Sequence, residues 1–145
     1  MSATPTSPTR RTAGIPRLLG PLAAWALMAV VAVANGVFRE TVLVPRIGEY
    51  TAHVLSTGLL AGAIAAFSYA FFATTDAEYA RGELLAVGTG WTVLTVGFEF
   101  LVGYVEGTPV STTLGQYDVL AGQVWILVPL TLFATPLLFG RRSRR

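Results

Sequence analysis

Several residues that could do chemistry fall inside otherwise apolar stretches of the chain. Glu99 lies among Val, Gly, Phe and Leu residues, where an isolated carboxylate is costly and requires a cation or a proton. Asn35 and Arg39 are one helical turn apart in another apolar stretch, and Glu49 and His53 are spaced in the same way. Polar groups at such positions indicate interhelical contacts or a pathway for an ion, a proton or a ligand.

The chain offers little for metal or nucleophilic chemistry. It has one histidine, His53, and no cysteine, which excludes haem held by two histidines, zinc sites with several histidines and any thiolate site. The sequence contains no Gly-x-Ser-x-Gly elbow and no glycine-rich phosphate loop, and Ser56 near His53 is ordinary helix spacing. We therefore predict no catalytic residue, no cofactor and no metal site.

The composition is typical of a membrane protein. Hydrophobic residues make up 53% of the 145 residues, and charged residues make up only 12%, against about 25% in soluble domains. Each of four apolar segments is long enough to cross the ~30 Å hydrocarbon core as a helix that rises 1.5 Å per residue. These predicted helices are residues 18–38, 51–73, 84–104 and 119–139.

We expect an all-α membrane protein with four transmembrane helices and both termini in the cytoplasm. The segments are apolar all round instead of alternating, which excludes a barrel. All ten basic residues are arginines, and eight of them flank the ends assigned to the cytoplasm, as the positive-inside rule requires. The other two, Arg39 and Arg46, fall in the first outer loop. A net charge of +2 attracts nucleic acid weakly, so the expected partner is the lipid bilayer.

The chain divides into two tails and one membrane domain. Residues 1–16, rich in Ser, Thr and Pro, are expected to be a disordered cytoplasmic tail, and residues 140–145 a basic cytoplasmic tail. Residues 17–139 form the four-helix domain. Its two outer loops end alike, in Gly48-Glu49-Tyr50 and Gly115-Gln116-Tyr117, which suggests two tandem hairpins. Ala32-Val33-Ala34 is similar to a signal-peptide cleavage site, but the long apolar stretch before it favours a retained helix.

Two further patterns bear on how the helices pack. The Gly58-x-x-x-Gly62 spacing predicts a close approach of two helices, either inside the bundle or between two copies of the chain. Pro129 lies near the middle of the fourth predicted helix, where a proline removes a backbone hydrogen bond and bends the helix. We therefore expect a kink or hinge at Pro129.

Counting residues along the segments places a polar group of every helix at a similar depth in the outer half of the membrane. Glu99 falls ~22 Å from the cytoplasmic end of its segment and Asn35 ~25 Å along its own, with Arg39 one turn farther. Because a buried carboxylate needs a partner, we predict an ion pair between Arg39 and Glu99. The predicted outer-leaflet polar cluster comprises Asn35, Arg39, Glu40, Glu49, His53, Ser56, Glu99 and Gln123.

The chain resembles uncharacterised small four-helix bacterial inner-membrane proteins over most of its length. The resemblance is carried by Asn35-Gly36-Val37-Phe38-Arg39-Glu40, by Gly48 to His53 with Leu55-Ser56, by Phe98-Glu99-Phe100 and by Gly103-Tyr104. It implies a four-span fold and a place in the bacterial cytoplasmic (inner) membrane, but no activity.

The function expected from these features is that of a multi-pass membrane protein, not an enzyme, whose polar cluster is structural or a membrane-assembly element. One alternative is a small ion- or proton-coupled channel or transporter, and a second is a minor membrane enzyme with Glu99 as its base. Four helices enclose too little for a large substrate, so transport would require a homo-oligomer or a partner membrane subunit. Solvent access to Glu99 separates a scaffold from a working site.

Overall fold

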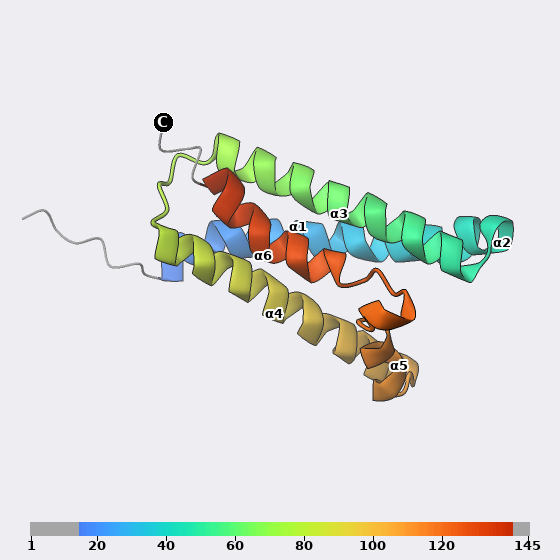
Figure 1. The fold of residues 1–145 in the computed structure, drawn as a ribbon. Helices are drawn as coiled ribbons and strands as arrows, with labels where there is room; N and C mark the ends of the chain where they lie inside the picture. The colour runs from blue at the N-terminus through green and yellow to red at the C-terminus, as the bar shows by residue number, and fades with distance from the viewer. Residues whose placement is uncertain (1–14, 141–145) are drawn as a thin grey trace, which may run out of the picture.

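The computed structural model describes residues 15–140, and in that part of the chain every regular element is a helix (Figure 1). Most of the two predicted tails, residues 1–14 and 141–145, lies outside the described residues. Three helical stretches are long and apolar enough to cross a membrane: Leu18–Ile47, Glu49–Thr74 and Arg81–Glu106. The chain is therefore a helical membrane protein.

The first half of the chain is a long helical hairpin. Helix α1 (Ile15–Phe38) continues through a π-helical turn, η1 (Arg39–Leu43), into the short helix α2 (Val44–Ile47). Gly48 has a φ of +84°, a conformation that suits glycine, and it alone separates α2 from α3 (Glu49–Thr74). The predicted outer loop is thus largely helical, because the polar residues after Phe38 extend the helix instead of ending it.

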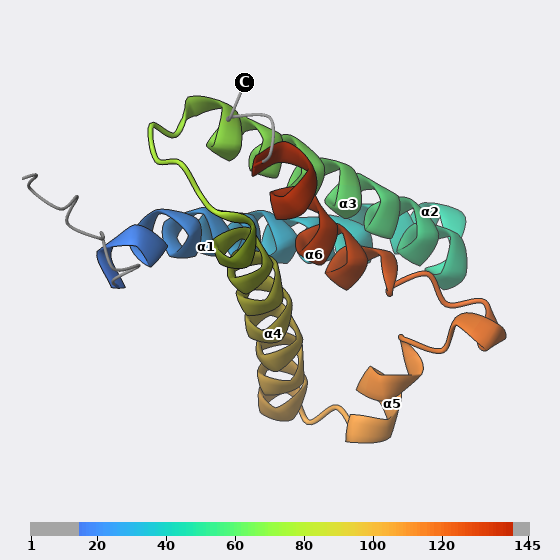
Figure 2. The same ribbon diagram turned by 60° about the vertical axis from the view of Figure 1, so that its left-hand side comes forward.

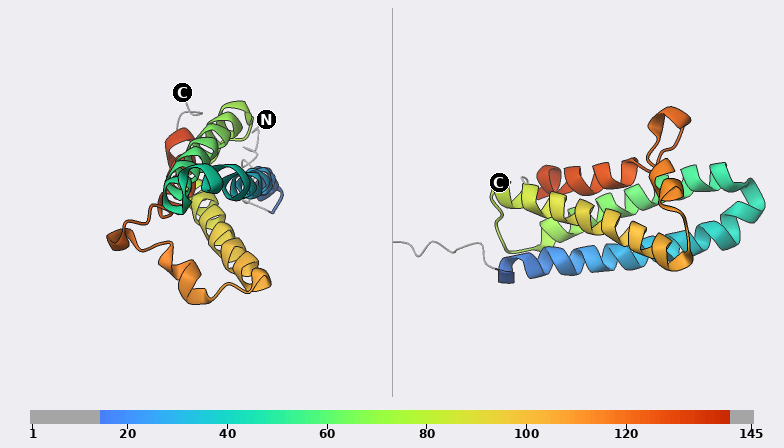
Figure 3. Two further views of the ribbon diagram at one scale, coloured as in Figure 1. Left: turned by 90° about the vertical axis from the view of Figure 1, so that its right-hand side faces the viewer. Right: turned by 90° about the horizontal axis from the view of Figure 1, so that it is seen from below.

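The second half begins with α4 (Arg81–Glu106), followed by the short α5 (Val110–Gly115) and the single 3-10 turn η2 (Val119–Ala121). The chain then returns in α6 (Leu127–Gly140). Figure 1 and the right-hand view of Figure 3 show α3 running back along α1, and α6 running back along α4. The start of α1 and the end of α6 consequently lie at the same end of the bundle.

The fourth helix is shorter than the sequence predicts. Residues 119–126 are not a continuous helix, because Gly122 adopts a φ of +84° and interrupts the chain before Leu127. The 14 residues of α6 cover about 21 Å, less than a full hydrocarbon core. The expected kink at Pro129 is also wrong, since Pro129 falls in the first turn of α6, where its missing N–H removes no helical hydrogen bond.

Helix α6 lies between α3 and α4 and packs against both. Figure 2 shows α4 diverging from α1 toward the end that leads into α5, and the chain from α5 to α6 forms an arch on that side. The core therefore gathers where α6 meets its two neighbours and where α1 closes over them. Its most deeply buried side chains are Met28, Leu60, Ile64, Phe72, Leu84, Val87, Trp91, Val128 and Leu132.

The closest approach of a glycine to the backbone of another helix lies outside the predicted small-residue pattern. A Cβ atom on Gly88 of α4 would lie 2.6 Å from the carbonyl oxygen of Phe133 on α6. Gly58 and Gly62, by contrast, are exposed on α3, and a Cβ atom on either would meet nothing within 4 Å. Close packing inside this chain therefore depends on Gly88 and not on the Gly58-x-x-x-Gly62 spacing.

The substitution Gly88→Ala should destabilise the bundle by about 1 to 3 kcal/mol, because the added methyl group forces α4 and α6 apart. The matched control is Gly90→Ala on the same helix, where a Cβ atom has open space. It should be neutral or stabilising by up to ~1 kcal/mol through helix propensity. Unfolding by titration with a denaturing detergent measures both. Equal stability of the two variants would contradict the close α4–α6 contact.

Candidate functional site

Glu99 is held by two neutral donors from the segment that precedes α6. The indole Nε1 of Trp125 donates to Glu99 Oε1 at 2.7 Å, and the phenol of Tyr117 donates to Glu99 Oε2. Tyrosine and tryptophan combine an apolar ring with one donor, so they can satisfy a carboxylate without bringing a charge into the bundle. All three side chains are half-buried.

The break in the fourth helix makes this arrangement possible. In a continuous helix, Tyr117 and Trp125 would be eight residues and about 12 Å apart along the axis, too far to share one carboxylate. The turn at Gly122, whose carbonyl accepts a hydrogen bond from Tyr50 at 2.9 Å, brings them together. Burial raises the pKa of Tyr117, and its hydrogen bond to Glu99 raises it further, so the phenol stays protonated as a donor.

The predicted ion pair between Arg39 and Glu99 is wrong. Arg39 and Glu40 are consecutive residues of η1, and Arg39 Nε donates to Glu40 Oε1 at 3.2 Å. Glu40 is largely exposed there, whereas Arg39 is half-buried. Glu99 is on α4 and bonds to Tyr117 and Trp125 instead.

The register of α1 against α4 explains why the two charges do not meet. Trp91 Nε1 donates to the carbonyl of Pro21, and Trp25 Nε1 donates to Thr95 Oγ1, both at 2.9 Å. Each bond joins residues that are 70 positions apart, so Arg39 is level with about position 109. This is roughly ten residues, or about 15 Å of helix, beyond Glu99. Counting residues from the ends of the apolar segments does not reveal this offset between α1 and α4.

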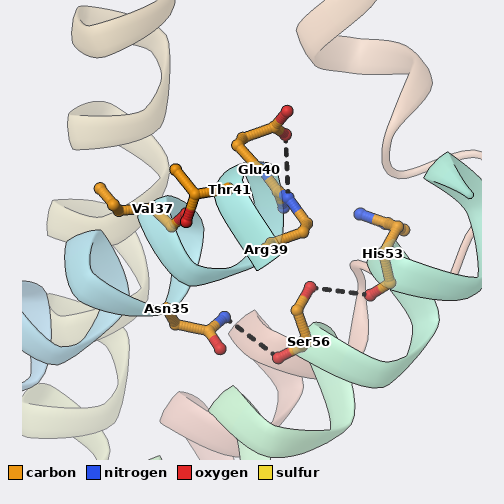
Figure 4. A network of polar contacts seen from close by, with 7 residues as sticks. All are labelled: Asn35, Val37, Arg39, Glu40, Thr41, His53 and Ser56. Atoms are coloured by element: carbon orange, nitrogen blue, oxygen red, sulfur yellow. Dashed lines mark hydrogen bonds and ion pairs between the residues drawn. The ribbon is translucent and has the colours of Figure 1, made fainter. Parts of the chain in front are cut away.

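A second group of predicted residues ties α1 to α3. Asn35 Nδ2 donates to the backbone carbonyl of Ser56 at 3.1 Å, and Ser56 Oγ donates to the carbonyl of His53 at 3.2 Å (Figure 4). Ser56 is fully buried, so these bonds satisfy polar groups inside the helix pair. The Asn35–Ser56 bond joins α1 to α3, whereas the Ser56–His53 bond lies within α3.

His53 connects the two groups. Its ring lies 5.8 Å from the ring of Trp125, with the planes tilted by 32°, and it faces the Arg39–Glu40 pair in Figure 4. Within residues 15–140, His53 Nε2 is a buried nitrogen with no hydrogen-bond partner. The two remaining predicted residues stand apart: Glu49 is exposed at the start of α3, and Gln123 is half-buried just after Gly122.

A cavity of about 550 Å³ runs between α1 and α4 and is bordered by Glu99 and Trp125. Its volume is in the range of small-molecule sites. The residues that line it on α1 extend from Trp25 to Thr41, about 24 Å of helix. The outer end carries polar side chains, and the inner end is formed by core side chains. The outer set includes Arg39, Glu40, Thr41, Glu106 and Gln116, and the inner set includes Met28, Leu60, Ile64 and Leu132.

Tyr117 and Trp125 are the site residues that sequence reasoning missed. Tyr117 is marked in the sequence only as the end of an outer loop, and no sequence pattern singles out Trp125. A usable signal exists, because each side chain has a single donor, and Tyr117 lies just before the predicted fourth span while Trp125 lies within it. Glu99 needs such donors at a similar depth. No family model, curated protein or solved structure matches the chain.

A double-mutant cycle should show that Glu99 is coupled to Tyr117 and not to Arg39. Each of Glu99→Gln and Tyr117→Phe weakens the same hydrogen bond, so their effects on the free energy of unfolding should differ from additivity by about 1 kcal/mol or more. The control cycle pairs Glu99→Gln with Arg39→Gln and should be additive within about 0.5 kcal/mol. Coupling between Glu99 and Arg39, together with additive effects of Glu99→Gln and Tyr117→Phe, would instead support an Arg39–Glu99 ion pair.

Proposed function

We propose that the chain is a four-span protein of the bacterial cytoplasmic membrane that binds a small molecule in the cavity beside Glu99. Helix α6 and the apolar residues before it supply the fourth crossing, which is supported by the position of the start of α1 and the end of α6 at one end of the bundle. α4 starts with Arg81 at that same end. The arginine distribution assigns this end to the cytoplasm.

The observation that carries the binding proposal is that Glu99 borders the cavity instead of being sealed in a closed network. A network that only holds helices together has no need of open space beside its carboxylate. Each carboxylate oxygen can accept about two hydrogen bonds, and Trp125 and Tyr117 use one on each. Glu99 is thus held in a fixed orientation with acceptor capacity left for a ligand.

The polar cluster divides between two roles under this proposal. The Asn35–Ser56 contact keeps the structural role expected for the whole cluster, while Glu99 belongs to the binding site. The inner end of the cavity is formed by core residues such as Met28 and Leu132, which favours binding over a continuous pore through one chain. Transport of the bound molecule would require an oligomer or a partner membrane subunit.

Cysteine labelling tests the proposal directly, because the chain has no cysteine of its own. Ala29 lines the cavity, whereas Ala34, on the same helix and nearer the outer end, is exposed on a surface outside the cavity. In spheroplasts treated with a membrane-impermeant thiol reagent, Ala29→Cys should react and Ala34→Cys should not, since a thiol in lipid forms little thiolate. Unreactive Ala29→Cys, with the folded yield unchanged, would contradict an open cavity.

Orientation is measured in the same series. Thr75→Cys lies between α3 and α4, at the end assigned to the cytoplasm. It should be protected in intact spheroplasts and should react once the membrane is permeabilised. Labelling of Thr75→Cys from outside would overturn the orientation.

A further inference from the structure

The charges that line the cavity point to the charge of its ligand. Four ionisable side chains border it: Arg39, Glu40, Glu99 and Glu106. Arg39 and Glu40 pair with each other, and among residues 15–140 Glu99 is bonded only to the uncharged donors Trp125 and Tyr117. The cavity wall is therefore acidic on balance, which attracts cations and repels anions most strongly where water is excluded.

Aromatic rings surround the same position. Trp25 and Phe98 line the cavity and meet edge to face, with ring centroids 6.4 Å apart, and Trp125 lines it beside Glu99. Aromatic faces attract organic cations, and quaternary ammonium groups in particular are bound by rings together with a carboxylate. A carboxylate among rings suits an ammonium group better than a strongly hydrated inorganic ion.

The inner end of the cavity requires an apolar group. This end is formed by Met28, Ile64 and Leu132. An apolar chain placed there covers the apolar surface that these side chains present to the cavity. A metal ion would leave this space empty and would need several oxygen ligands. Within residues 15–140, no three acidic or histidine side chains come together in a way that could hold a metal ion.

Building on the binding function proposed above, we propose that the ligand is an amphiphilic organic cation. Its ammonium group lies beside Glu99 and the rings of Trp25 and Trp125, and its apolar group occupies the inner end of the cavity. It enters from the outer side, past Glu106.

Three probes with the same chain and different head groups test this inference: decyltrimethylammonium, decyl sulfate and decanol. Binding to the full chain in lipid nanodiscs is measured by equilibrium dialysis below the micellar concentration, with empty nanodiscs subtracted. The ammonium probe should bind saturably and about tenfold more tightly than the other two. Glu99→Gln should weaken ammonium binding about tenfold and change decanol binding by less than about twofold.

Two glycine variants show where the probe binds. Gly36 lines the cavity and a Cβ atom there meets nothing within 4 Å, so Gly36→Leu should fold, obstruct the cavity and abolish binding. Gly97 is an exposed glycine of α4 outside the cavity with equally open space, and Gly97→Leu should bind as the wild type does.

The outcomes separate this inference from the function on which it rests. Equal binding of all three probes, tighter binding of the sulfate, or a Glu99→Gln variant that still prefers the ammonium would overturn the cationic ligand. The binding function would stand in those cases if Gly36→Leu still abolished binding. If no probe shows binding that Gly36→Leu abolishes, the result depends on the labelling of Ala29→Cys. Reaction of Ala29→Cys from outside would then overturn only the cationic ligand, whereas an unreactive Ala29→Cys would overturn the binding function as well.

Discussion

The carboxylate of Glu99 has to be satisfied inside an apolar helical bundle, and the outer half of the molecule depends on how this is done. Two neutral donors, Tyr117 and Trp125, bond to its two oxygens. Because a continuous helix would hold these donors about 12 Å apart, the chain turns at Gly122 and α6 begins only at Leu127. The short fourth helix and the arch before it thus allow both donors to reach one half-buried acid.

Neutral donors also leave the site open to a ligand. Had Arg39 reached Glu99, an ion pair would have closed the space between α1 and α4 and neutralised its charge. Instead Arg39 remains on a π-helical turn near the outer end of the cavity, paired with its neighbour Glu40. Such turns are frequent at functional sites. The ring contact between His53 and Trp125 links His53 of α3 to one of the two donors that hold Glu99.

The helical membrane fold was predictable, because apolar segments of membrane length can be read directly from the order of residues along the chain. The register between helices was not, since it depends on specific contacts such as that of Trp91 with the Pro21 carbonyl, which place Arg39 roughly ten residues beyond the level of Glu99. Likewise, the sequence marks Gly58 as a packing glycine, but Gly88 is the glycine that lies against the backbone of another helix, at Phe133. Local patterns predict what a residue needs, and tertiary packing decides which partner supplies it.

The hydrogen bond from Trp125 to Glu99 is tested most directly by NMR of the chain labelled with 15N at tryptophan. Trp25, Trp91 and Trp125 each donate an indole N–H to another helix or segment, so the three resonances act as controls for one another. The Trp125 indole resonance is assigned by its disappearance in Trp125→Phe. It should be protected from exchange with solvent hydrogen, and among the three indole resonances its chemical shift should change most in Glu99→Gln. A Trp125 indole that exchanges as an exposed group does, and does not respond to Glu99→Gln, would contradict the account.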